Sequence, residues 1–456
     1  MNHDVIVVGS GQAGGPLATR FAGAGKRVLL VERKHFGGTC INYGCTPTKT
    51  MVASARAAHV ARRAARLGVK TGEVRVDLAA VVDRKDAVVR QWRDGLARKF
   101  EGTGENLATV KGHARFVGSR EIEVNGERHR GEVVIVNTGG RPLVPPIAGL
   151  DAVPWLDNAK VMDLRALPAH LVVLGGGYIA CEFGQMFRRF GAEVTIVQRG
   201  PHLFDREDVD VSEAIEGVFR EEGIHLVLGA EGKSVAKKAD EIVLTLGDGK
   251  QVRGSHLLVA VGRRPNTDDL HCEAAGVKLD KRGAVIVDDR YRTSAEGVFA
   301  VGDVTGGPQF THTSWDDHRI LYDLLAGTGK RTRADRLVPY CVFTDPQVAR
   351  VGLSERDAKE KGIEVEVANL PFGSIARAIE LDETAGTMKV LLDPKTERVL
   401  GAAIVGKEAG ELIHIFVALM QAGATASAIV DAEAIHPTFA EGVQSLVMSL
   451  PRYELT

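Results

Sequence analysis

The segment that decides the fold is DVIVVGSGQAGGPLATRFAGAGKRVLLVERK, residues 4–34: an apolar strand at 5–8, a glycine turn, an amphipathic helix and a second strand ending at Glu32. The turn has the spacing G-x-G-x-x-G, formed by Gly9, Gly11 and Gly14. Glycine suits these positions because the backbone bends sharply, approaches a pyrophosphate and packs a helix closely on a strand. Glu32, placed 18 residues after Gly14, can accept hydrogen bonds from ribose hydroxyls. The segment therefore predicts a dinucleotide-binding βαβ unit.

A second segment of this kind, HLVVLGGGYIACEFGQMFRRFGAEVTIVQRG, occupies residues 170–200. Its turn contains Gly175 and Gly177, and its third small residue is Ala180. At the end of its second strand, Gln198 followed by Arg199 replaces the expected acid. Loss of the carboxylate removes repulsion towards a 2′-phosphate, and an arginine can pair with that phosphate. The segment favours NADPH over NADH, with a solvated surface role for Arg199 as the alternative.

Two dinucleotide sites on one chain are typical of a bound flavin and a diffusing nicotinamide, between which a hydride passes. A later strand, at 298–301, ends in Gly302-Asp303. A carboxylate at the carboxyl end of a strand could hold a polyol hydroxyl. An ordinary structural turn at this place is an equally simple interpretation.

Two cysteines, Cys40 and Cys45, lie close together in GGTCINYGCTPTKT, residues 37–50, which we expect to be a loop that runs into a helix. The chain has 5 cysteines, too few and too scattered for a secreted disulfide framework. A zinc site would need further ligands at similar spacing, so no metal is expected. From the spacing alone, redox chemistry and two buried thiols both remain open, because the familiar redox spacing is C-x-x-C.

Composition narrows the class of protein. A length of 456 residues suggests about three domains. The 58 lysines and arginines nearly balance 59 acids, so neither a nucleic-acid footprint nor a polybasic membrane patch is present. No signal-like leader or membrane-length apolar run occurs, which predicts a cytoplasmic protein without membrane partners. The basic run at 55–68 predicts a helix with its arginines on a solvated face.

Taken together, the motifs resemble those of the class I pyridine nucleotide-disulfide oxidoreductases, which include dihydrolipoamide dehydrogenase, glutathione reductase and mercuric reductase. The resemblance covers nearly the whole chain. Its parts, in family order, are the first glycine unit with Glu32, GGTCINYGCTPTK, VVIVNTGGRP (133–142), GGGYIACE (175–182), AVGRRPNTD (260–268), VFAVGDV (298–304), VFTDPQVARVG (342–352) and HPTFAEG (436–442).

The resemblance implies an α/β fold with two Rossmann-like dinucleotide-binding domains, for FAD and NAD(P), and a C-terminal α+β dimerisation domain. We expect the FAD domain at 1–147 and 268–335, the nucleotide domain at 148–267 and the dimerisation domain at 336–456. Segments rich in turn residues at 141–150 and 327–339 support these boundaries.

The resemblance also implies roles for the reacting residues. Cys45 corresponds to the flavin-proximal cysteine and Cys40 to the interchange cysteine that attacks substrate. Lys49 and Glu182 correspond to an ion pair beside flavin N5, where a fixed cation favours hydride arrival. Tyr178 corresponds to the aromatic gate that covers the flavin until nicotinamide displaces it, with a core tyrosine as the alternative.

A histidine and a glutamate in HPTFAEG complete the implied active site. His436 and Glu441 match a dyad that the second subunit of a homodimer supplies, so the active sites are shared. A proton donor that works near neutral pH suits thiol chemistry, and a carboxylate can orient the imidazole. A simple capping role for His436 is the alternative.

Further residues are implied to bind cofactor. Asp303 corresponds to a ligand of the ribityl chain. Thr311 and His312 begin a helix whose positive end would face flavin N1 and the C2 carbonyl. The remaining cofactor-binding positions are Thr39, Ala114, Thr138, Gly139 and Gly262.

The implied reaction passes a hydride from NADPH through FAD to a Cys40–Cys45 disulfide, and then to a small oxidised or electrophilic substrate. The stretches at 309–320 and 338–343 resemble the mercuric-reductase-like branch that includes hypothiocyanous acid reductases. No cysteine follows Cys341, whereas mercuric reductases carry a C-terminal pair. Thr46 stands where relatives usually carry an aliphatic residue, and we expect its hydroxyl, placed beside Cys45, to stabilise the Cys45 thiolate.

Three alternatives remain from the sequence. A dihydrolipoamide dehydrogenase using NAD is disfavoured by Gln198. A cysteine-independent NADPH oxidase or diaphorase would leave Cys40 and Cys45 without a role. A catalytically silent subunit would have no need of the His436 and Glu441 pair.

Overall fold

The computed structural model describes residues 1–453. The chain forms two compact units, of which the first comprises Met1–Thr50, Ala80–Leu143 and Gly262–Arg336 and the second comprises Met51–Ala79, Val144–Val261 and Leu337–Thr456. Among residues 1–453, the structure contains no helix with the combined length and apolar character needed to cross a membrane.

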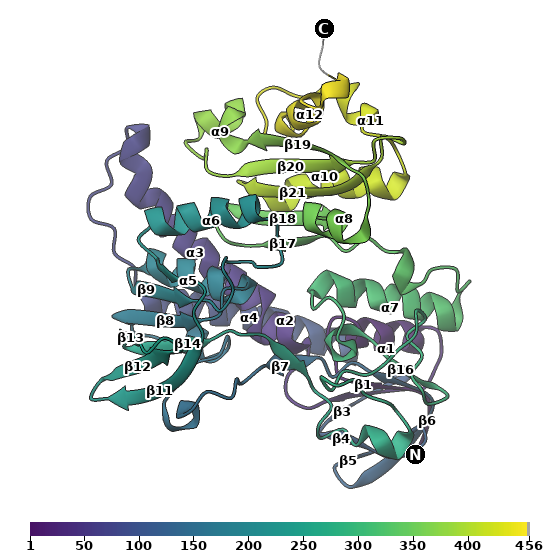
Figure 1. Ribbon diagram of the computed structural model, residues 1–456. Coiled ribbons are helices and arrows are strands. Elements are labelled where there is room, and N and C mark those ends of the chain that lie inside the picture. The colour runs from purple at the N-terminus through teal and green to yellow at the C-terminus, as the bar shows by residue number, and fades with distance from the viewer. Residues whose placement is uncertain (454–456) are drawn as a thin grey trace. The chain divides into compact units, whose positions relative to one another are not determined.

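The first unit is built on a seven-stranded sheet in the order β3-β2-β1-β6-β5-β4, with β16 also paired to β6 (Figure 1). Its parallel strands are β1 (Asn2–Val8), β2 (Val28–Glu32), β3 (Leu107–Lys111), β6 (Glu127–Val136) and β16 (Val298–Ala300). Its antiparallel strands are β4 (Ala114–Gly118) and β5 (Glu121–Val124). A small ladder joins β7 (Gly140–Pro142) to β15 (Arg263–Pro265).

Both faces of the parallel strands are buried, because successive residues of a strand point to opposite sides. Ile6 and Leu29 pack in one apolar cluster, whereas Val7 and Leu30 pack in another. The helices of this unit are α1 (Gly14–Gly23), α2 (Gly38–Tyr43), the start of α3 (Cys45–Arg63), most of α4 (Leu78–Glu101) and α7 (Thr311–Ala326). The βαβ unit predicted from residues 4–34 is confirmed as β1, α1 and β2.

The second unit contains a parallel four-stranded sheet in the order β10-β9-β8-β14. Its elements are β8 (His170–Leu174), α5 (Tyr178–Phe190), β9 (Glu193–Val197), α6 (Val209–Glu221), β10 (His225–Val227) and β14 (His256–Val259). An antiparallel sheet follows, with β11 (Gly232–Lys238), β12 (Glu241–Leu246) and β13 (Gln251–Gly254). The second predicted βαβ unit is therefore also present, with its last strand ending at Val197, one residue before Gln198.

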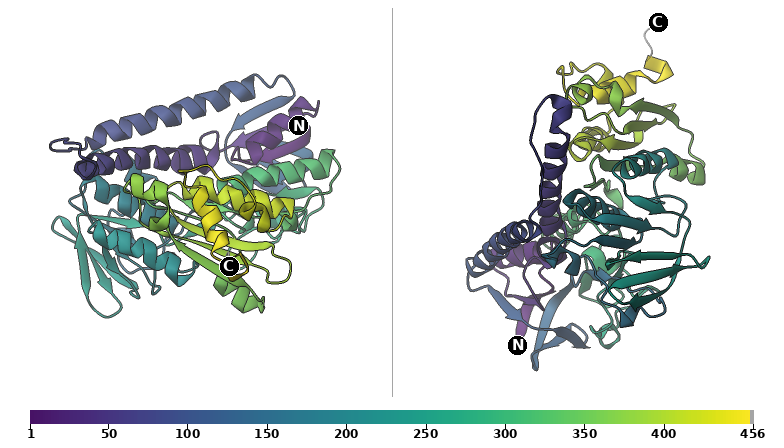
Figure 2. Two further views of the ribbon diagram at one scale, coloured as in Figure 1. Left: turned by 90° about the horizontal axis from the view of Figure 1, so that it is seen from above. Right: turned by 90° about the vertical axis from the view of Figure 1, so that its left-hand side faces the viewer.

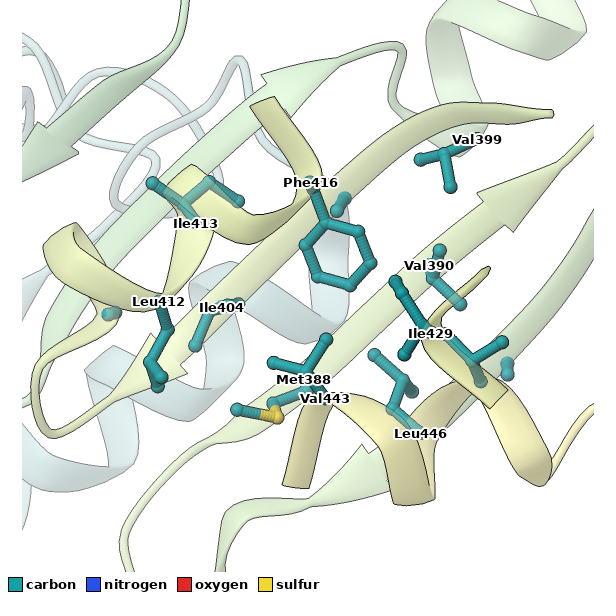
Figure 3. Close-up of a cluster of buried hydrophobic side chains, with 14 of the residues drawn as sticks. Met388, Val390, Val399, Ile404, Leu412, Ile413, Phe416, Ile429, Val443 and Leu446 are labelled. Carbon is teal, nitrogen blue, oxygen red and sulfur yellow. The ribbon is translucent and has the colours of Figure 1, made fainter. Parts of the chain in front are cut away.

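The C-terminal part of the second unit is an antiparallel five-stranded sheet in the order β17-β18-β21-β20-β19. The strands are β17 (Tyr340–Val342), β18 (Gln347–Gly352), β19 (Glu366–Pro371), β20 (Thr387–Leu392) and β21 (Val399–Gly406). The helices are α8 (Glu355–Lys361), α9 (Ala376–Glu380), α10 (Ala409–Ala422), α11 (Ser427–Val430) and α12 (Glu441–Met448). Phe416 of α10 points towards strand residues such as Val390, and Leu446 of α12 belongs to the same core (Figure 3). This part is the α+β region that the sequence predicted.

The basic run at 55–68 is helical, and Arg62 and Arg66 are exposed as predicted, but Arg56 and Arg63 are partly buried in ion pairs. It lies mostly in α3, one long helix in Figure 2. Arg56 pairs with Asp345 and Glu383, and Arg63 Nη2 lies 2.9 Å from Asp382 Oδ2. The acids that neutralise these arginines follow about 300 residues later in the chain, so no local charge pattern could reveal them.

Candidate active site

The stretch with the two cysteines is helical on both sides of one glycine, rather than the loop predicted. Cys40 lies in α2 and Cys45 is the first residue of α3, with Gly44 between the two helices. A Cβ at Gly44 would lie 3.0 Å from the Thr39 carbonyl oxygen and 3.2 Å from the Cys40 Cα. Asn42, a buried residue, donates to the carbonyls of Gly38 and Phe36 at 2.8 and 2.9 Å. The close turn at Gly44 places both thiols at the start of α3.

The two thiols interact with each other and with a hydroxyl group. A hydrogen bond to Cys45, together with burial, raises the pKa of the Cys40 thiol. Cys45 Sγ lies 3.0 Å from Thr311 Oγ1. Thr311 is the first residue of α7, so two helix N-termini, those of α3 and α7, meet at Cys45. Helix N-termini and hydroxyl donors both favour a thiolate.

Thr46 does not occupy the position predicted for it. The hydrogen bond found at Thr46 joins its carbonyl to the Thr50 hydroxyl at 2.8 Å, and the hydroxyl that contacts Cys45 is that of Thr311. Successive residues of a helix point about 100° apart, so the side chain after Cys45 is directed away from the sulfur. The placement predicted for the Thr46 hydroxyl is therefore wrong, and Thr311 supplies the hydroxyl that lies beside Cys45.

Two of the other three cysteines have a raised thiol pKa without a second thiol among its causes, and the third, Cys341, has its Sγ 3.9 Å from Gln347 Oε1. Cys181 and Cys272 are buried in apolar surroundings. Burial raises the pKa of the Cys181 thiol, and it raises the pKa of Cys272 to about 11. Thiols of this kind react slowly because little thiolate forms. Cys40 and Cys45 are the cysteine pair with the contacts that redox chemistry requires.

The first glycine turn leaves no room for side chains. Gly9 has a φ of +99°, and a Cβ at Gly14 would lie 2.0 Å from the Gly9 carbonyl oxygen. Glu32 Oε2 accepts hydrogen bonds from the Ser10 amide at 3.0 Å and the Ser10 hydroxyl at 2.6 Å. The acid therefore lies beside the turn, where the ribose of a bound dinucleotide would lie. This close packing fits FAD at the N-terminus of α1.

No sequence pattern pointed to Asn137, a buried residue that fixes the same turn. Its Oδ1 accepts from the Gly14 amide at 2.9 Å, and its Nδ2 donates to the Val301 carbonyl at 2.9 Å. A Cβ at Gly11 would lie 2.9 Å from Asn137 Oδ1. Asn137 thus joins α1 to the end of β16. Standing in NTGG, it looks like an ordinary turn residue.

The other residues assigned to FAD lie in the first unit. Thr138 Oγ1 donates to the Asn266 carbonyl at 2.8 Å, and the Asn266 amide donates to the Gly139 carbonyl at 3.0 Å. Asp303 follows β16, and burial raises the pKa of its carboxyl, while Arg263, 3.8 Å away, opposes that rise. Thr39 lies in α2, Ala114 begins β4, Gly262 precedes β15 and His312 is exposed in the first turn of α7.

The second glycine turn is closely packed at Gly175 but open at Gly177, unlike the first turn. Gly175 has a φ of +117°, and a Cβ there would lie 2.5 Å from the Ala260 carbonyl oxygen. The side chain of Gln198 covers Gly176, whereas Gly177 faces open space. Tyr178 begins α5 directly after this turn. The open side at Gly177 leaves room for a diffusing nucleotide.

The residues expected near a 2′-phosphate follow β9. Arg199 is exposed, and within residues 1–453 it has no ion pair. Gln198 Nε2 lies 3.4 Å from Asp205 Oδ2. An unpaired exposed guanidinium can accept a phosphate partner without first breaking an existing contact.

Lys49 and Glu182 belong to different compact units. Lys49 lies one helical turn after Cys45 in α3, so it shares a face of that helix with the cysteine. Glu182, a buried residue of α5, accepts a hydrogen bond from the Phe343 amide at 2.8 Å. Their ion pair stays a prediction.

His436 and Glu441 are brought together as predicted. His436 Nδ1 lies 2.9 Å from Glu441 Oε2. The side chain of His436 is 70% exposed, whereas that of Glu441 is only 18% exposed. The carboxylate can orient the ring and leave Nε2 available to exchange a proton.

Comparison with known proteins identifies the family. A family model described as pyridine nucleotide-disulphide oxidoreductase matches residues 3–317. A second model, for the dimerisation domain of these enzymes, matches residues 338–447. The chain belongs to the pyridine nucleotide-disulfide oxidoreductase family. It is therefore an oxidoreductase of an FAD-dependent family that uses NAD(P)H, and its fold is α/β with two dinucleotide-binding domains and a C-terminal dimerisation domain.

Individual members of this oxidoreductase family match along nearly the whole chain. The probable pyridine nucleotide-disulfide oxidoreductase RclA of Escherichia coli K12 is 37% identical over 455 residues, covering 97% of this chain and 98% of that protein. A mercuric reductase of Staphylococcus aureus is 36% identical, covering 99% and 83%. The solved structure of the HOCl-induced flavoprotein disulfide reductase RclA from Escherichia coli matches with a TM-score of 0.90 at 36% identity, covering 98% of this chain and 99% of that one.

Proposed function

We propose that this oxidoreductase carries electrons from NADPH through Cys40 and Cys45 to a small oxidised or electrophilic substrate. The contact of 3.0 Å between Cys45 Sγ and Thr311 Oγ1 is the observation that carries the proposal. It lies where two helices begin, and such a place favours the reactive thiolate. FAD, when bound, supplies the hydride acceptor between the nucleotide and the cysteines.

The two cysteines divide the substrate reaction between them. In the dithiol form, the Cys40 thiolate attacks one sulfur of a disulfide substrate, which breaks the substrate S–S bond and releases the first thiolate. The Cys45 thiolate then attacks Cys40 Sγ, which re-forms the Cys40–Cys45 disulfide and releases the second. The substrate gains two electrons and two protons. Hypothiocyanite would be attacked by Cys40 at its sulfur, which breaks the S–O bond and releases hydroxide, and the attack of Cys45 on Cys40 Sγ would then release thiocyanate.

His436 is the proton donor of this scheme, and Glu441 orients it. The contact of 2.9 Å between their side chains supports this assignment. The exposed side chain of His436, next to Ile435 at 77% exposure, is consistent with a surface that a second subunit covers. The match to the dimerisation-domain model supports a homodimer, and we infer that its two active sites are shared between subunits.

NADPH is the coenzyme that the second glycine turn favours. Gly175, Gly177 and Tyr178 would line the nucleotide site. Gln198 brings no charge to it, and the unpaired guanidinium of Arg199 suits a 2′-phosphate. The absence of an acid at Gln198 also disfavours a dihydrolipoamide dehydrogenase that uses NAD.

The residues that we assign to FAD binding rest on the close packing of the first glycine turn. We place FAD at Gly9, Gly11, Gly14 and Glu32, with Thr39, Ala114, Thr138, Gly139, Asp303, Thr311 and Gly262 around it. Lys49 with Glu182 would favour hydride arrival at the flavin.

The domain boundaries at 147, 267 and 335 are part of this proposal. A cytoplasmic location suits it, because that compartment keeps thiols reduced.

Anaerobic titration of the FAD protein with NADPH tests the proposal. Two electrons should produce a long-wavelength absorbance band from the Cys45 thiolate beside the flavin. Cys45→Ala should lose this band and the turnover of disulfide substrates while the flavin is still reduced. If the band is absent from the wild-type protein and Cys45→Ala turns over substrate as fast, the protein is a cysteine-independent oxidase or diaphorase.

The substrate class is tested with a panel. Oxidised glutathione, lipoamide, Hg(II) and hypothiocyanite differ in size and in the atom that a thiolate attacks. We expect small electrophiles to give higher kcat/KM than oxidised glutathione. The opposite order would assign the protein to reduction of larger disulfides.

A further inference from the structure

The tyrosine at the second glycine turn is held between two aromatic rings. The Tyr178 ring stacks on Tyr340 of β17, with ring centroids 5.5 Å apart and an interplanar angle of 29°. On another side it meets Phe204, with centroids 5.7 Å apart at 46°. Burial raises the pKa of the Tyr178 hydroxyl, and a side-chain hydrogen bond with Tyr340 opposes that rise. Aromatic pairs of this kind hold a ring in one position.

Tyr340 is itself fixed by a buried ion pair. Its hydroxyl donates to Glu207 Oε1, and Glu207 Oε2 lies 2.9 Å from Arg350 Nη1. Glu207 and Arg350 are each only 5% exposed. Arg350 is the cross-strand partner of Tyr340 in the β17 and β18 ladder. Burial and the nearby Glu207 carboxylate raise the pKa of Tyr340, so its hydroxyl remains a donor.

One loop joins this cluster to the predicted coenzyme site. Residues 198–208 run from the end of β9 to the start of α6 and include Arg199, Phe204 and Glu207. The Phe204 amide donates to the Gly176 carbonyl at 2.9 Å, which ties the loop to the glycine turn. The ring that meets Tyr178 and the carboxylate that holds Tyr340 thus lie in the loop that begins at the expected 2′-phosphate site.

We propose that Tyr340, fixed by Glu207, is a positioning residue that holds the Tyr178 ring over the nicotinamide site and so opposes coenzyme entry. The proposal rests on the proposed function, in which Tyr178 covers the flavin until nicotinamide displaces it. To move aside, the Tyr178 ring must leave the face of Tyr340. Any interaction lost in that step weakens the apparent affinity for the coenzyme, because the open state is less populated.

The size of the effect follows from the strength of an aromatic pair. Removal of the Tyr340 ring should lower the dissociation constant of NADP⁺ roughly 2- to 10-fold. Removal of the hydroxyl alone keeps the stack but releases it from Glu207, so Tyr340→Phe should give a smaller decrease. Faster opening affects coenzyme binding rather than the thiol chemistry, so KM for NADPH should fall while kcat changes little.

The test uses the FAD-loaded protein and its Tyr340→Leu and Tyr340→Phe variants. Tyr453→Phe is the matched control, because the Tyr453 hydroxyl also donates to a carboxylate, Glu397 Oε2, at 3.0 Å. NADP⁺ is titrated into the oxidised protein while the flavin absorbance spectrum is recorded. This spectrum reports whether the nicotinamide site is open, which a loss of stability alone would not change. Thermal unfolding then checks that each variant is folded.

Lower dissociation constants and larger spectral changes in both Tyr340 variants, with the control unchanged, support the inference. A dissociation constant and spectrum equal to those of the wild type in Tyr340→Phe and Tyr340→Leu overturn it. So does a weaker affinity without a spectral change, since Tyr340 would then only form part of the binding surface. If NADPH fails to reduce the flavin of the wild-type protein, the proposed function itself is wrong. If NADPH reduces that flavin but the Tyr340 variants behave like the wild type, only the inference about Tyr340 is wrong.

Discussion

Thr311 Oγ1 lies 3.0 Å from Cys45 Sγ, and this contact joins the first residue of α7 to the first residue of α3. The sulfur therefore lies beside a hydroxyl, which can donate to a thiolate, and beside the positive ends of two helices. Both effects stabilise a thiolate more than a thiol. The position before Thr311 is Phe310, which acts as the N-cap residue without a side-chain cap. Thr311 is thus free of a capping role and can serve the cysteine.

We expect Thr311→Val to raise the pH midpoint of the Cys45 thiolate band. Loss of one hydrogen bond of about 1 kcal/mol corresponds to a shift of roughly half to one pH unit. The midpoint is measured by pH titration of the long-wavelength absorbance of the two-electron-reduced protein. Thr46→Val is the matched control and should leave the midpoint unchanged. A shift in the control but not in Thr311→Val would return the role to Thr46.

A second prediction concerns the histidine and glutamate near the C-terminus. His436→Gln should lower kcat for a disulfide substrate roughly 100-fold, because a positioned proton donor contributes at least that factor. Glu441→Gln should have a smaller effect, since the imidazole remains but loses its orienting carboxylate. Flavin reduction by NADPH, followed by stopped flow, should be unaffected in both variants.

His414→Gln is the control for this pair, because His414 is an exposed histidine of α10 in the same domain. Its turnover should equal that of the wild type. Unchanged turnover in His436→Gln would mean that solvent supplies the proton, and that the contact of 2.9 Å to Glu441 is structural.

The preference for NADPH over NADH can be tested by reversing the charge of a single residue, Arg199. Arg199→Glu should lower kcat/KM for NADPH roughly 10- to 100-fold, because a charged hydrogen bond to the 2′-phosphate is lost and repulsion takes its place. The value for NADH should change much less. Lys233→Glu, an exposed residue of β11, changes the net charge equally and serves as the control. Equal losses with both coenzymes would show that Arg199 does not contact the 2′-phosphate.

Sequence patterns predicted the two βαβ units closely, because each combines a strand, a glycine turn and a helix within about 30 neighbouring residues. Two bounds differ: β1 begins at Asn2 rather than at residue 5, and β9 ends at Val197 rather than at Gln198. The helix α2 was missed because Gly38–Tyr43 is too short to show a periodic apolar pattern. The tight turn at Gly44 was missed with it, because that turn brings Gly44 close to the backbone of Thr39 and Cys40 in α2.

Residues that act through partners far along the chain could not be found in the same way. Asn137 contacts Gly14 and Val301, which lie more than 100 residues away on either side. The resemblance placed Thr311 near the flavin, but its contact with Cys45 arises because α7 and α3 begin at the same place. The resemblance supplied the pairing of His436 with Glu441, which the structure confirms as a contact.

The last prediction concerns Asp345, which pairs with Arg189 of α5 and with Arg56 of α3. Although burial raises it, the two guanidiniums lower the pKa of the Asp345 carboxyl to about 2. A pKa depressed in the folded state contributes stability that is complete above the unfolded value, near pH 4, and is lost as the pH falls towards 2. Asp345→Asn should therefore lower the free energy of unfolding at pH 7 by about 2 kcal/mol. Between pH 4 and 2 the variant should lose less stability than the wild type.

Urea unfolding at pH 7 and pH 3 measures both effects, with Asp240→Asn, at an exposed turn, as the control. If Asp345→Asn and the wild type lose the same stability between these pH values, the two arginines do not hold the carboxylate ionised, and the link between α3 and α5 has another origin.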